Sequence, residues 1–491
     1  MTPEDYAQFD GIGLARLIKR GEISPAEAVK AALERIAQTN PAINAVIETW
    51  GSRTARKIAA LPDLPGGPLA GVPFLLKDVG GSEPGVSHEC GSRLARDMAP
   101  DKVETALMRR YREAGLISIG RATSPEFAFN ITSENILHGP TRNPWSLRHS
   151  PGGSSGGASA AVAAGMVPIA EANDGGGSIR IPAACCGLFG LKPSRGRISM
   201  APGAWEYLCG LSATHVVSRS VRDSAAALDA ATGAEPGDPY PVRAPERSYL
   251  AELDQPLGSL RVGLMLAPWN GGALHPDCRR ATLEAAALIA DMGVVVEEAT
   301  PDLGIDWEGF MLANARIWCS NIALWIDGLA AATGRPIGTD TLERSSLACY
   351  HFGKSMSAYD LLDAVAVCNM VSRKVGQFFE RYDLLLTPSL PQPPHLLGVY
   401  DANADYADGL AWTRKIFGGS PYTPTFNVTG QPAVSIPWDL NDEGLPIGVH
   451  FAARMGDEAG LFRMGAAIER ARPWAQRRPP LALSLAEVAG G

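Results

Sequence analysis

The chain has 491 residues, of which 46% are hydrophobic and 20% are charged, so it can bury a large core. A net charge of -8 argues against a surface built to bind nucleic acid. Eight cysteines without a CxxC spacing exclude a recognisable zinc or redox motif and favour reduced thiols, so we expect a cytoplasmic protein.

The N-terminus, MTPEDYAQFD, lacks a charged segment followed by an apolar one, so no secretion signal is expected. The longest run of small apolar residues, 156–170, contains several glycines and Pro168, which argues against a membrane span. Histidines and carboxylates do not occur at metal-ligand spacing, so we expect no metal and no cofactor. The expected partner is a small molecule, with neither nucleic acid nor membrane involved.

Helix and strand patterns alternate along the first half of the chain. The SPAE sequence from Ser24 has the form of a capping box and starts a helix. Further on we expect a strand at 42–50, a strand buried on both faces at 72–77, a helix at 105–114, a strand at 116–119 and a short helix from Ser124. This alternation predicts an α/β fold with a largely parallel or mixed sheet.

The second half of the chain continues this pattern around a long helical region. We expect helices at 221–232, 275–292 and 457–469, and strands at 260–265, 294–298, 383–387, 433–436 and 448–452. Residues from about 307 to 382 show helical patterns only. Because no internal repeat is present, we expect one domain over 1–491 with a largely helical insertion at about 307–382.

Two serines flanked by glycines stand out in the segment 149–195: Ser154 in GGSSGG and Ser178 in DGGGSIR. Glycines let backbone N–H groups converge on one small volume, so such a loop can hold an oxyanion. A flexible linker or a phosphate-binding loop is the alternative, although no GxxxxGKS or GxGxxG sequence occurs. Lys77, in the apolar frame GVPFLLKD, adds a candidate base; a lysine that only extends from a strand end to solvent is the alternative.

Four segments occur in the order typical of one enzyme family: GVPFLLKD, SPGGSSGG, DGGGSIRIPA with GLKPS after it, and FNVTGQPAVSIP. On these segments the chain resembles the amidase signature family. The resemblance implies the amidase signature fold, a central twisted mixed β-sheet covered by helices on both faces. It also implies hydrolysis of carboxylic amides through an acyl-enzyme intermediate.

The resemblance assigns a role to each candidate residue. It implies that Ser178 is the nucleophile, that Ser154 follows a cis peptide bond and relays a proton, and that Lys77 is the base. It also implies an oxyanion hole formed by Gly175, Gly176, Gly177 and the N–H of Ser178. A lysine base must be neutral, and desolvation in an apolar strand lowers a lysine pKa.

Supporting roles leave alternatives open. Ser155 either hydrogen-bonds to Lys77 or caps the helix that follows it. Asp174 and Arg180 form an ion pair that braces the glycine loop, or each is an ordinary solvated charge. His149 is close to Ser154 in sequence and is expected to shape the loop.

Two positions depart from the common family pattern. The residue after Asp174 is often threonine or isoleucine, but here it is Gly175, so we expect a looser oxyanion loop. Glu171 stands where many relatives have an apolar residue. If it is buried, its carboxyl group needs a partner or a proton.

Substrate choice is read from two segments, NDGGGSIRIPA and ANARIWCSNIALW. They resemble the branch of the family that contains the 6-aminohexanoate-cyclic-dimer hydrolases, which degrade nylon oligomers. That resemblance implies a substrate-binding role for Cys319; a buried helix cysteine is the alternative. The aromatic residues Trp318, Trp325, Tyr422 and Phe426 either line an apolar pocket or belong to the core.

The expected substrate is therefore the cyclic dimer of 6-aminohexanoate or a similar cyclic or linear amide. One alternative is a broad-specificity aryl acylamidase or carbamate hydrolase. A second is the amidotransferase component of a tRNA-transamidating complex, which works with partner subunits. A catalytically silent binding protein is disfavoured because both serines and the lysine are present. The resemblance leaves open whether the chain works alone or as a homodimer.

Overall fold

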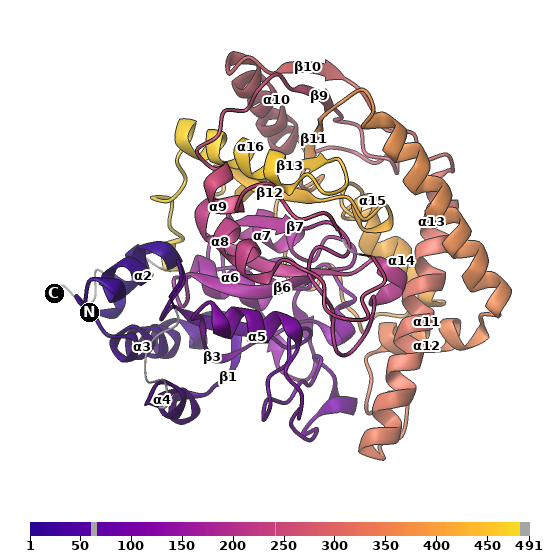
Figure 1. The fold of residues 1–491 in the computed structure, drawn as a ribbon. Coiled ribbons are helices and arrows are strands. Elements are labelled where there is room, and N and C mark those ends of the chain that lie inside the picture. Colours follow the sequence, from indigo (N-terminus) through magenta and orange to yellow (C-terminus); the bar gives the residue numbers. More distant parts are fainter. Residues whose placement is uncertain (60–65, 241, 482–491) are drawn as a thin grey trace.

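The computed structural model describes residues 1–59, 66–240 and 242–481, and in them an eleven-stranded sheet runs through the centre of the molecule (Figure 1). The strands of this sheet are β1 (Val46–Thr49), β2 (Pro73–Lys77), β3 (Ile117–Ala122), β6 (Ile169–Asp174), β7 (Phe189–Lys192), β8 (Ala213–Ser218), β9 (Arg261–Leu264), β10 (Val295–Glu298), β11 (Leu384–Pro388), β12 (Ala433–Leu440) and β13 (Pro446–Ala453). A separate small hairpin pairs β4 (Glu134–Asn135) with β5 (Gly139–Pro140).

The strand order in the large sheet is β1-β3-β2-β6-β8-β7-β12-β13-β11-β9-β10. β2 lies parallel to both β3 and β6, and β9 lies parallel to both β10 and β11. The remaining pairs are antiparallel, including the hairpin of β12 and β13. The predicted mixed sheet is therefore confirmed.

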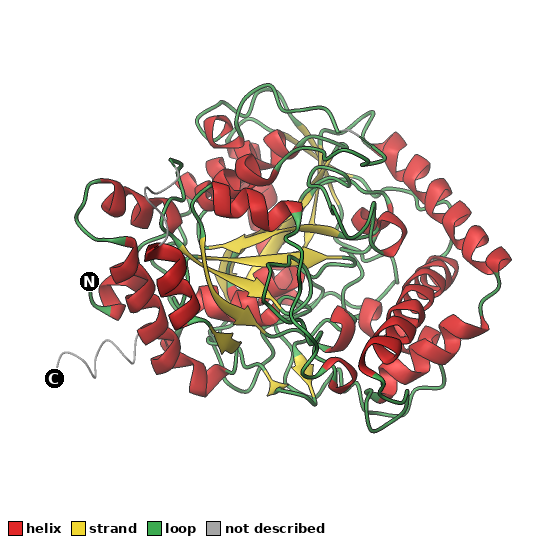
Figure 2. Ribbon diagram, turned by 60° about the horizontal axis from the view of Figure 1, so that its bottom comes forward, coloured by secondary structure: helices red, strands yellow, loops and turns green. Residues whose placement is uncertain are grey.

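Helices cover both faces of the sheet (Figure 2). They are α1 (Pro3–Gln8), α2 (Gly11–Lys19), α3 (Pro25–Ile43), α4 (Gly51–Ala59), α5 (Ala106–Glu113), α6 (Gly156–Ala163), α7 (Arg180–Cys186), α8 (Val221–Ala231), α9 (Tyr249–Glu252), α10 (Pro276–Asp291), α11 (Trp307–Thr333), α12 (Arg344–Ser355), α13 (Ala358–Phe378), α14 (Gly409–Gly418), α15 (Thr425–Val428) and α16 (Glu458–Ala471). Side chains of β2 alternate between two cores: Phe74 and Leu76 pack with residues of α5, α8 and α16, whereas Leu75 packs with residues of α3 and α6. This is the two-residue period of a strand buried on both faces.

The region 307–382 contains the long helices α11, α12 and α13, which lie together along one side of the molecule (Figure 1). Their apolar faces build a third core with α14, and this core also includes Leu385 of β11, Ala433 of β12 and Ala452 of β13. No helix in the described part of the chain is long and apolar enough to cross a membrane.

Two predicted elements are wrong in their bounds or type. The strand expected at 42–50 is shorter, because α3 runs to Ile43 and Asn44 ends it in the left-handed region at φ 52°. The Asn40 side chain accepts hydrogen bonds from the N–H groups of Ala45 and Val46, which fixes this turn before β1 begins. The short helix expected from Ser124 is a 3-10 turn, Glu126–Ala128, in which Phe127 also has a positive φ of 52°.

Candidate active site

The candidate residues meet at the carboxyl ends of two neighbouring parallel strands. Leu75 of β2 pairs with Ala170 of β6, so both strands point the same way and end at the same edge of the sheet. Lys77 is the last residue of β2, and Asp174 is the last residue of β6. Ligands of α/β sheets bind at this edge, and the glycine loop 175–178 begins there.

Strand alternation also decides which face of the sheet Lys77 occupies. Leu75 packs on the side of α6, so Lys77, two residues later, faces the same side. Ser154 and Ser155 directly precede α6. The helix comes very close to the sheet edge: a Cβ on Gly157 would lie only 2.5 Å from the carbonyl oxygen of Thr123. The absence of a side chain at Gly157 allows this approach.

The amino group of Lys77 is fully buried and makes three polar contacts. Its Nζ lies 2.8 Å from Ser154 Oγ, 3.0 Å from Ser155 Oγ and 2.6 Å from Asn173 Oδ1. Burial lowers the pKa of Lys77 to about 7, because the nearby carboxylates offset only part of the lost hydration. A large fraction of this lysine is therefore neutral at neutral pH.

The partners of Lys77 decide where its lone pair points. Asn173 donates its Nδ2 hydrogen to the carbonyl of Val79, so its Oδ1 can only accept from Lys77. Ser155 donates its hydroxyl hydrogen to the carbonyl of Asn173 at 3.2 Å, so its Oγ also accepts from Lys77. A neutral amine has two hydrogens, and both are taken. Its lone pair is left for the hydroxyl of Ser154.

Asn173 was not identified from the sequence, and only the register of β6 beside β2 brings it to Lys77. For Ser155, the structure decides between the two interpretations: it bonds to Lys77, and its side chain does not cap α6. His149 lies elsewhere and bonds to Ser146 Oγ at 2.8 Å.

Ser178 is the last residue of the glycine loop 175–178 and is 8% exposed. Ser154, Asn173 and Ser178 line the same cavity. The two serine loops are tied together because the N–H of Ser155 donates to the carbonyl of Ser178 at 3.3 Å, and the Gly153–Ser154 peptide is cis, as the resemblance implies. Within the described residues no hydrogen bond joins Ser154 Oγ to Ser178 Oγ.

The glycine loop corrects one predicted oxyanion donor. The N–H of Gly177 donates to Asp174 Oδ1 at 2.7 Å and is not available to a substrate. The N–H groups of Gly175, Gly176 and Ser178 have no acceptor in the part of the chain that the structure describes. These three amides remain as donors for a developing oxyanion.

The loop is held firmly, so the expectation that Gly175 loosens it is wrong. A Cβ on Gly175 would lie 2.7 Å from Cζ2 of Trp318, and one on Gly176 would lie 2.8 Å from Cε1 of Phe417. Thr423 Oγ1 donates to the carbonyl of Gly176 at 2.7 Å. Glycine is needed here because neighbouring side chains occupy the space.

The predicted ion pair of Asp174 and Arg180 is present and holds this loop in place. Arg180 donates from Nε to Asp174 Oδ2 at 2.9 Å and from Nη2 to Oδ1 at 3.0 Å, and both side chains are fully buried. Asn427 Nδ2 also donates to Asp174 Oδ1, at 2.8 Å. Burial alone would raise the pKa of Asp174, but Arg180 outweighs it and holds the pKa below its usual value. Asp174 is thus a fixed anion that orients the glycine loop.

The buried carboxylate of Glu171 accepts hydrogen bonds from two backbone N–H groups. Its Oε2 accepts the backbone N–H of Lys77 at 3.2 Å, and its Oε1 accepts the N–H of Gly81. Burial raises the pKa of this carboxyl group to about 7. Glu171 therefore anchors the backbone on both sides of the turn that follows β2.

The cavity beside Ser178 has a volume of about 630 Å³, which suits a small organic substrate. Its wall on the side of α11 is formed by Trp318, Asn321, Ile322, Leu324, Trp325 and Leu329. A more polar part is formed by Ser82, His88 and Asp101, with Ser82 Oγ donating to Asp101 at 2.6 Å.

Cys319 is not among the residues that line this cavity, so its predicted substrate-binding role is wrong. The side chain is fully buried on another face of α11, where it contacts Cys349 of α12 and approaches Gly409 of α14. One residue along a helix is a rotation of about 100°, which turns Cys319 away while Trp318 faces the cavity. Tyr422 and Phe426 are also core residues.

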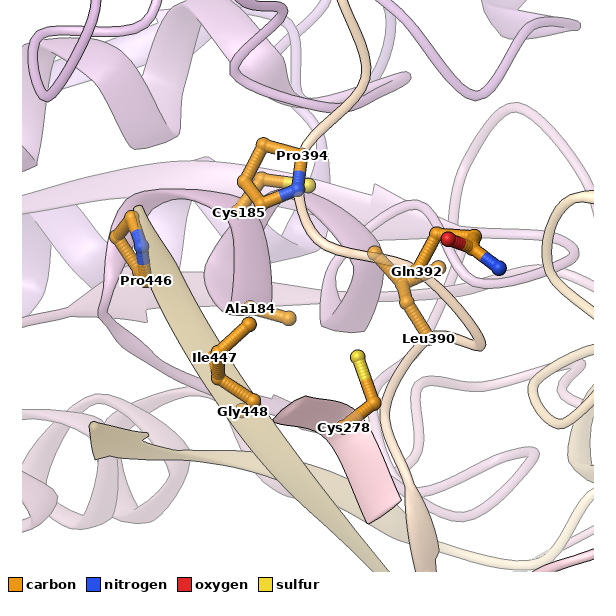
Figure 3. A pocket seen from close by; sticks show the side chains of 9 residues that line it. All are labelled: Ala184, Cys185, Cys278, Leu390, Gln392, Pro394, Pro446, Ile447 and Gly448. Carbon is orange, nitrogen blue, oxygen red and sulfur yellow. The ribbon is translucent and has the colours of Figure 1, made fainter. Parts of the chain in front are cut away.

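A second cavity lies between α7, α10, β13 and the segment after β11, and its lining includes the thiols of Cys185 and Cys278 (Figure 3). Its volume of about 10 Å³ is enough for at most one water molecule. It is therefore too small for an amide substrate. In the described ranges no three His, Cys, Asp or Glu side chains are grouped so that they could hold a metal ion.

Fold and site together define an amidase, and the chain belongs to the Amidase family, whose sequence profile matches residues 27–462. It is a hydrolase of amide C–N bonds. The chain is 36% identical over 481 residues to 6-aminohexanoate-cyclic-dimer hydrolase of Pseudomonas sp. strain NK87. The aligned region covers 96% of each protein.

Solved structures agree with this relationship. The structure of a 6-aminohexanoate cyclic dimer hydrolase is 34% identical, has a TM-score of 0.91 and covers 97% of this chain and 99% of that one. A bacterial aryl acylamidase is 27% identical, has a TM-score of 0.86 and covers 95% and 97% of the two chains. The family expected from the motifs is therefore confirmed, and so is the expected similarity to the 6-aminohexanoate-cyclic-dimer hydrolases.

Proposed function

We propose that this chain hydrolyses amides through nucleophilic attack by Ser178, with Lys77 as base and Ser154 as the relay between them. The observation that carries the proposal is the arrangement around Lys77. Its amine is buried, Asn173 and Ser155 take both hydrogens of the neutral form, and the lone pair faces Ser154. A lysine without that lone pair cannot act as a base.

In the first half of the reaction, Ser178 Oγ forms a bond to the carbonyl carbon of the amide. Its proton passes to Ser154, whose own proton passes to Lys77. The N–H groups of Gly175, Gly176 and Ser178 stabilise the oxyanion. The C–N bond then breaks, and the protonated Lys77 returns a proton through Ser154 to the leaving nitrogen. An acyl ester on Ser178 and a free amine result.

In the second half, a water molecule attacks the ester carbonyl carbon. The same relay takes one proton from this water and returns it to Ser178 Oγ as the C–O bond of the ester breaks. The carboxylic acid product leaves and the enzyme regains its starting state. The relay requires Ser154 Oγ and Ser178 Oγ to come within hydrogen-bond distance when substrate is bound, as catalytic hydrogen bonds often tighten in the complex.

For the substrate, we propose the cyclic dimer of 6-aminohexanoate or a similar cyclic or linear amide, with no nucleic acid or membrane partner. The 36% identical hydrolase supports the cyclic dimer, and the cavity of about 630 Å³ has room for it. An aryl acylamidase is the second candidate. The aromatic wall of Phe127, Trp318 and Trp325 favours it, because aryl groups pack well on such rings.

A substrate panel with the purified chain tests this proposal. The cyclic dimer, a linear 6-aminohexanoate amide, an anilide and a carbamate are compared by kcat/KM, and the cyclic dimer is expected to give the highest value. A higher value for the anilide or carbamate would support the second candidate instead. If no amide is hydrolysed until the other members of a tRNA-transamidating complex are added, the chain acts as the amidotransferase component of such a complex, and the proposal fails.

The relay is tested by Ser154→Ala, with Ser155→Ala as a matched control. Both variants remove one hydroxyl that contacts Lys77, but only Ser154 lies on the proposed proton path. Loss of proton transfer is expected to lower kcat by about 10² to 10⁴-fold in Ser154→Ala. The control is expected to lose about tenfold or less. Equal losses in the two variants would remove Ser154 from the relay.

A further inference from the structure

Leu208 lies in the wall of the substrate cavity, directly beside the glycine loop. It is one of the residues that line this cavity, and its side chain is partly exposed. A Cβ on Gly175 would lie 2.9 Å from Cδ1 of Leu208 and 2.7 Å from Cζ2 of Trp318. The tip of the leucine and the edge of the indole ring therefore lie together over Gly175, whose N–H is one of the three donors left for an oxyanion.

The backbone at Leu208 has a conformation that leucine rarely adopts. Leu208 begins the 3-10 turn Leu208–Gly210, and both Leu208 and Cys209 have positive φ values, of 57° and 51°. For bulky residues this left-handed region costs free energy. Such residues persist where the surrounding structure holds them, and they concentrate at functional sites. The turn thus indicates a role for the side chain that it places beside the glycine loop.

Two side chains hold this turn against the glycine loop. Arg195 donates from Nε to the carbonyl of Gly210 at 2.5 Å and from Nη2 to the carbonyl of Asn427 at 2.9 Å. Asn427 Nδ2 donates to the carbonyl of Leu211 at 3.0 Å and to the carbonyl of Asp174 at 2.8 Å. The same amide group therefore contacts the residue after the turn and the residue before the glycine loop. The position of the turn relative to the loop is fixed by these bonds.

The proposed reaction decides which part of the substrate faces Leu208. The carbonyl oxygen points to the amides of the glycine loop, and the leaving nitrogen lies near Ser154, from which it receives its proton. A tetrahedral intermediate on Ser178 has one substituent left, which is the acyl carbon next to the carbonyl. The cavity extends along α11 from Trp318 to Leu329, so the acyl chain enters it past Leu208.

We propose that Leu208 restricts substitution at the acyl carbon next to the scissile carbonyl. A CH₂ group at this carbon passes the leucine side chain, whereas methyl branches there collide with it, because Arg195 and Asn427 hold the turn in place. The favoured substrates are then amides whose acyl chain is unbranched next to the carbonyl, as a 6-aminohexanoyl unit is. The proposal rests on the proposed function for the positions of the oxyanion and the leaving nitrogen.

Leu208→Ala is tested with four anilides whose acyl groups are isomers: valeryl, 3-methylbutyryl, 2-methylbutyryl and pivaloyl. Only the last two are branched next to the carbonyl. For these two, kcat/KM relative to the valeryl anilide is expected to be at least about tenfold higher in the variant than in wild type. The ratio for the 3-methylbutyryl anilide is expected to change by less than about threefold. Unchanged ratios for all three branched anilides would overturn the proposal.

The valeryl amide of 2-methylaniline carries an added methyl group on the leaving side instead. In Leu208→Ala its kcat/KM relative to the valeryl anilide is expected to stay within about twofold of the wild-type ratio. A gain for this substrate without a gain for the branched acyl groups would contradict the proposal, because the leaving group would then face Leu208.

Leu324→Ala is the matched control for the removal of a leucine from the cavity wall. Leu324 lines the same cavity but lies about 9 Å further along α11 than Trp318, and its side chain is largely exposed. The branched-to-unbranched ratios are expected to stay within about twofold of wild type in this variant. A gain as large as in Leu208→Ala would refute a specific role for Leu208.

Cys209→Gly separates the leucine side chain from the backbone of the turn. Glycine adopts positive φ values without strain, so this variant relieves part of the strain and keeps Leu208. The unfolding temperature is expected to be no lower than that of wild type, and the branched-to-unbranched ratios are expected to stay within about twofold. If this variant accepts branched acyl groups as well as Leu208→Ala does, the conformation of the turn sets the selectivity and the proposal fails.

A binding measurement gives an answer without turnover. The Kd values of the valeryl and pivaloyl anilides are measured with Ser178→Ala and with the double variant Ser178→Ala/Leu208→Ala. The second substitution is expected to tighten binding of the pivaloyl anilide at least about fivefold and to change that of the valeryl anilide by less than about twofold. Equal changes, or no binding of the pivaloyl anilide to the double variant, would overturn the proposal. If wild type hydrolyses none of the anilides, the proposed function fails for this substrate class, whereas these Kd values still decide the role of Leu208.

Discussion

Ser178→Ala is expected to abolish amide hydrolysis, with kcat reduced on the order of 10⁴ to 10⁶-fold, because it removes the hydroxyl on which the proposed acyl ester forms. The fold should be unaffected. Ser178 Oγ makes no hydrogen bond to another described residue, so its removal should change the free energy of unfolding by about 0.5 kcal/mol or less. Product release measures the first effect, and thermal unfolding measures the second.

Ser159→Ala is the matched control for this variant. Ser159 is a fully buried serine of α6 whose Oγ has no partner within the described residues, and it does not line the cavity. Its replacement is expected to leave kcat within about twofold of wild type. Substantial turnover by Ser178→Ala at an unchanged unfolding temperature would show that another group is the nucleophile.

Lys77→Met is expected to reduce kcat by at least about 10³-fold, because methionine keeps the volume of the side chain but its thioether sulfur is far too weak a base to take the Ser154 proton. Lys77→Arg should not restore activity, since a guanidinium stays charged. Lys192 offers a control because it is a second buried lysine, and burial lowers its pKa to about 7 as well. Its amino group, however, donates to the carbonyl of Pro193. Lys192→Met should lose far less activity.

The same base predicts the pH dependence of the wild-type enzyme. Burial lowers the pKa of Lys77 to about 7, so the proton leaves this amine as the pH rises through that value. Only the neutral form accepts a proton from Ser154, and kcat/KM should therefore rise from about pH 6 and level off above about pH 8. A profile that is flat between about pH 6 and about pH 9, or activity of Lys77→Arg near wild type, would exclude a neutral lysine base.

The sequence by itself determined the parts that depend on local pattern. An apolar run that ends in Lys77 predicts a buried strand with the lysine at its edge, and the structure has both. The charges of Asp174 and Arg180 are six residues apart around a glycine loop, so their ion pair could also be expected. The order of the motifs indicated the family, because each motif is a short continuous segment.

Other features were decided only by contacts between distant segments. Asn173 reaches Lys77 because β6 lies in one particular register beside β2, and no spacing along the chain encodes that register. The face of α11 that meets the cavity depends on how α12 and α14 pack against it, which turns Cys319 into the core and Trp318 towards Gly175.

The hydrogen bond from the N–H of Gly177 to Asp174 also depends partly on contacts between distant segments. Asp174 is only three residues away, but Arg180 and Asn427 hold its carboxylate in the orientation that takes this N–H. Hydrogen-bond partners of buried groups are chosen by whichever donors and acceptors the fold brings together. Local sequence therefore indicated the candidate reacting side chains, and tertiary packing decided which donors and lone pairs are left for a substrate.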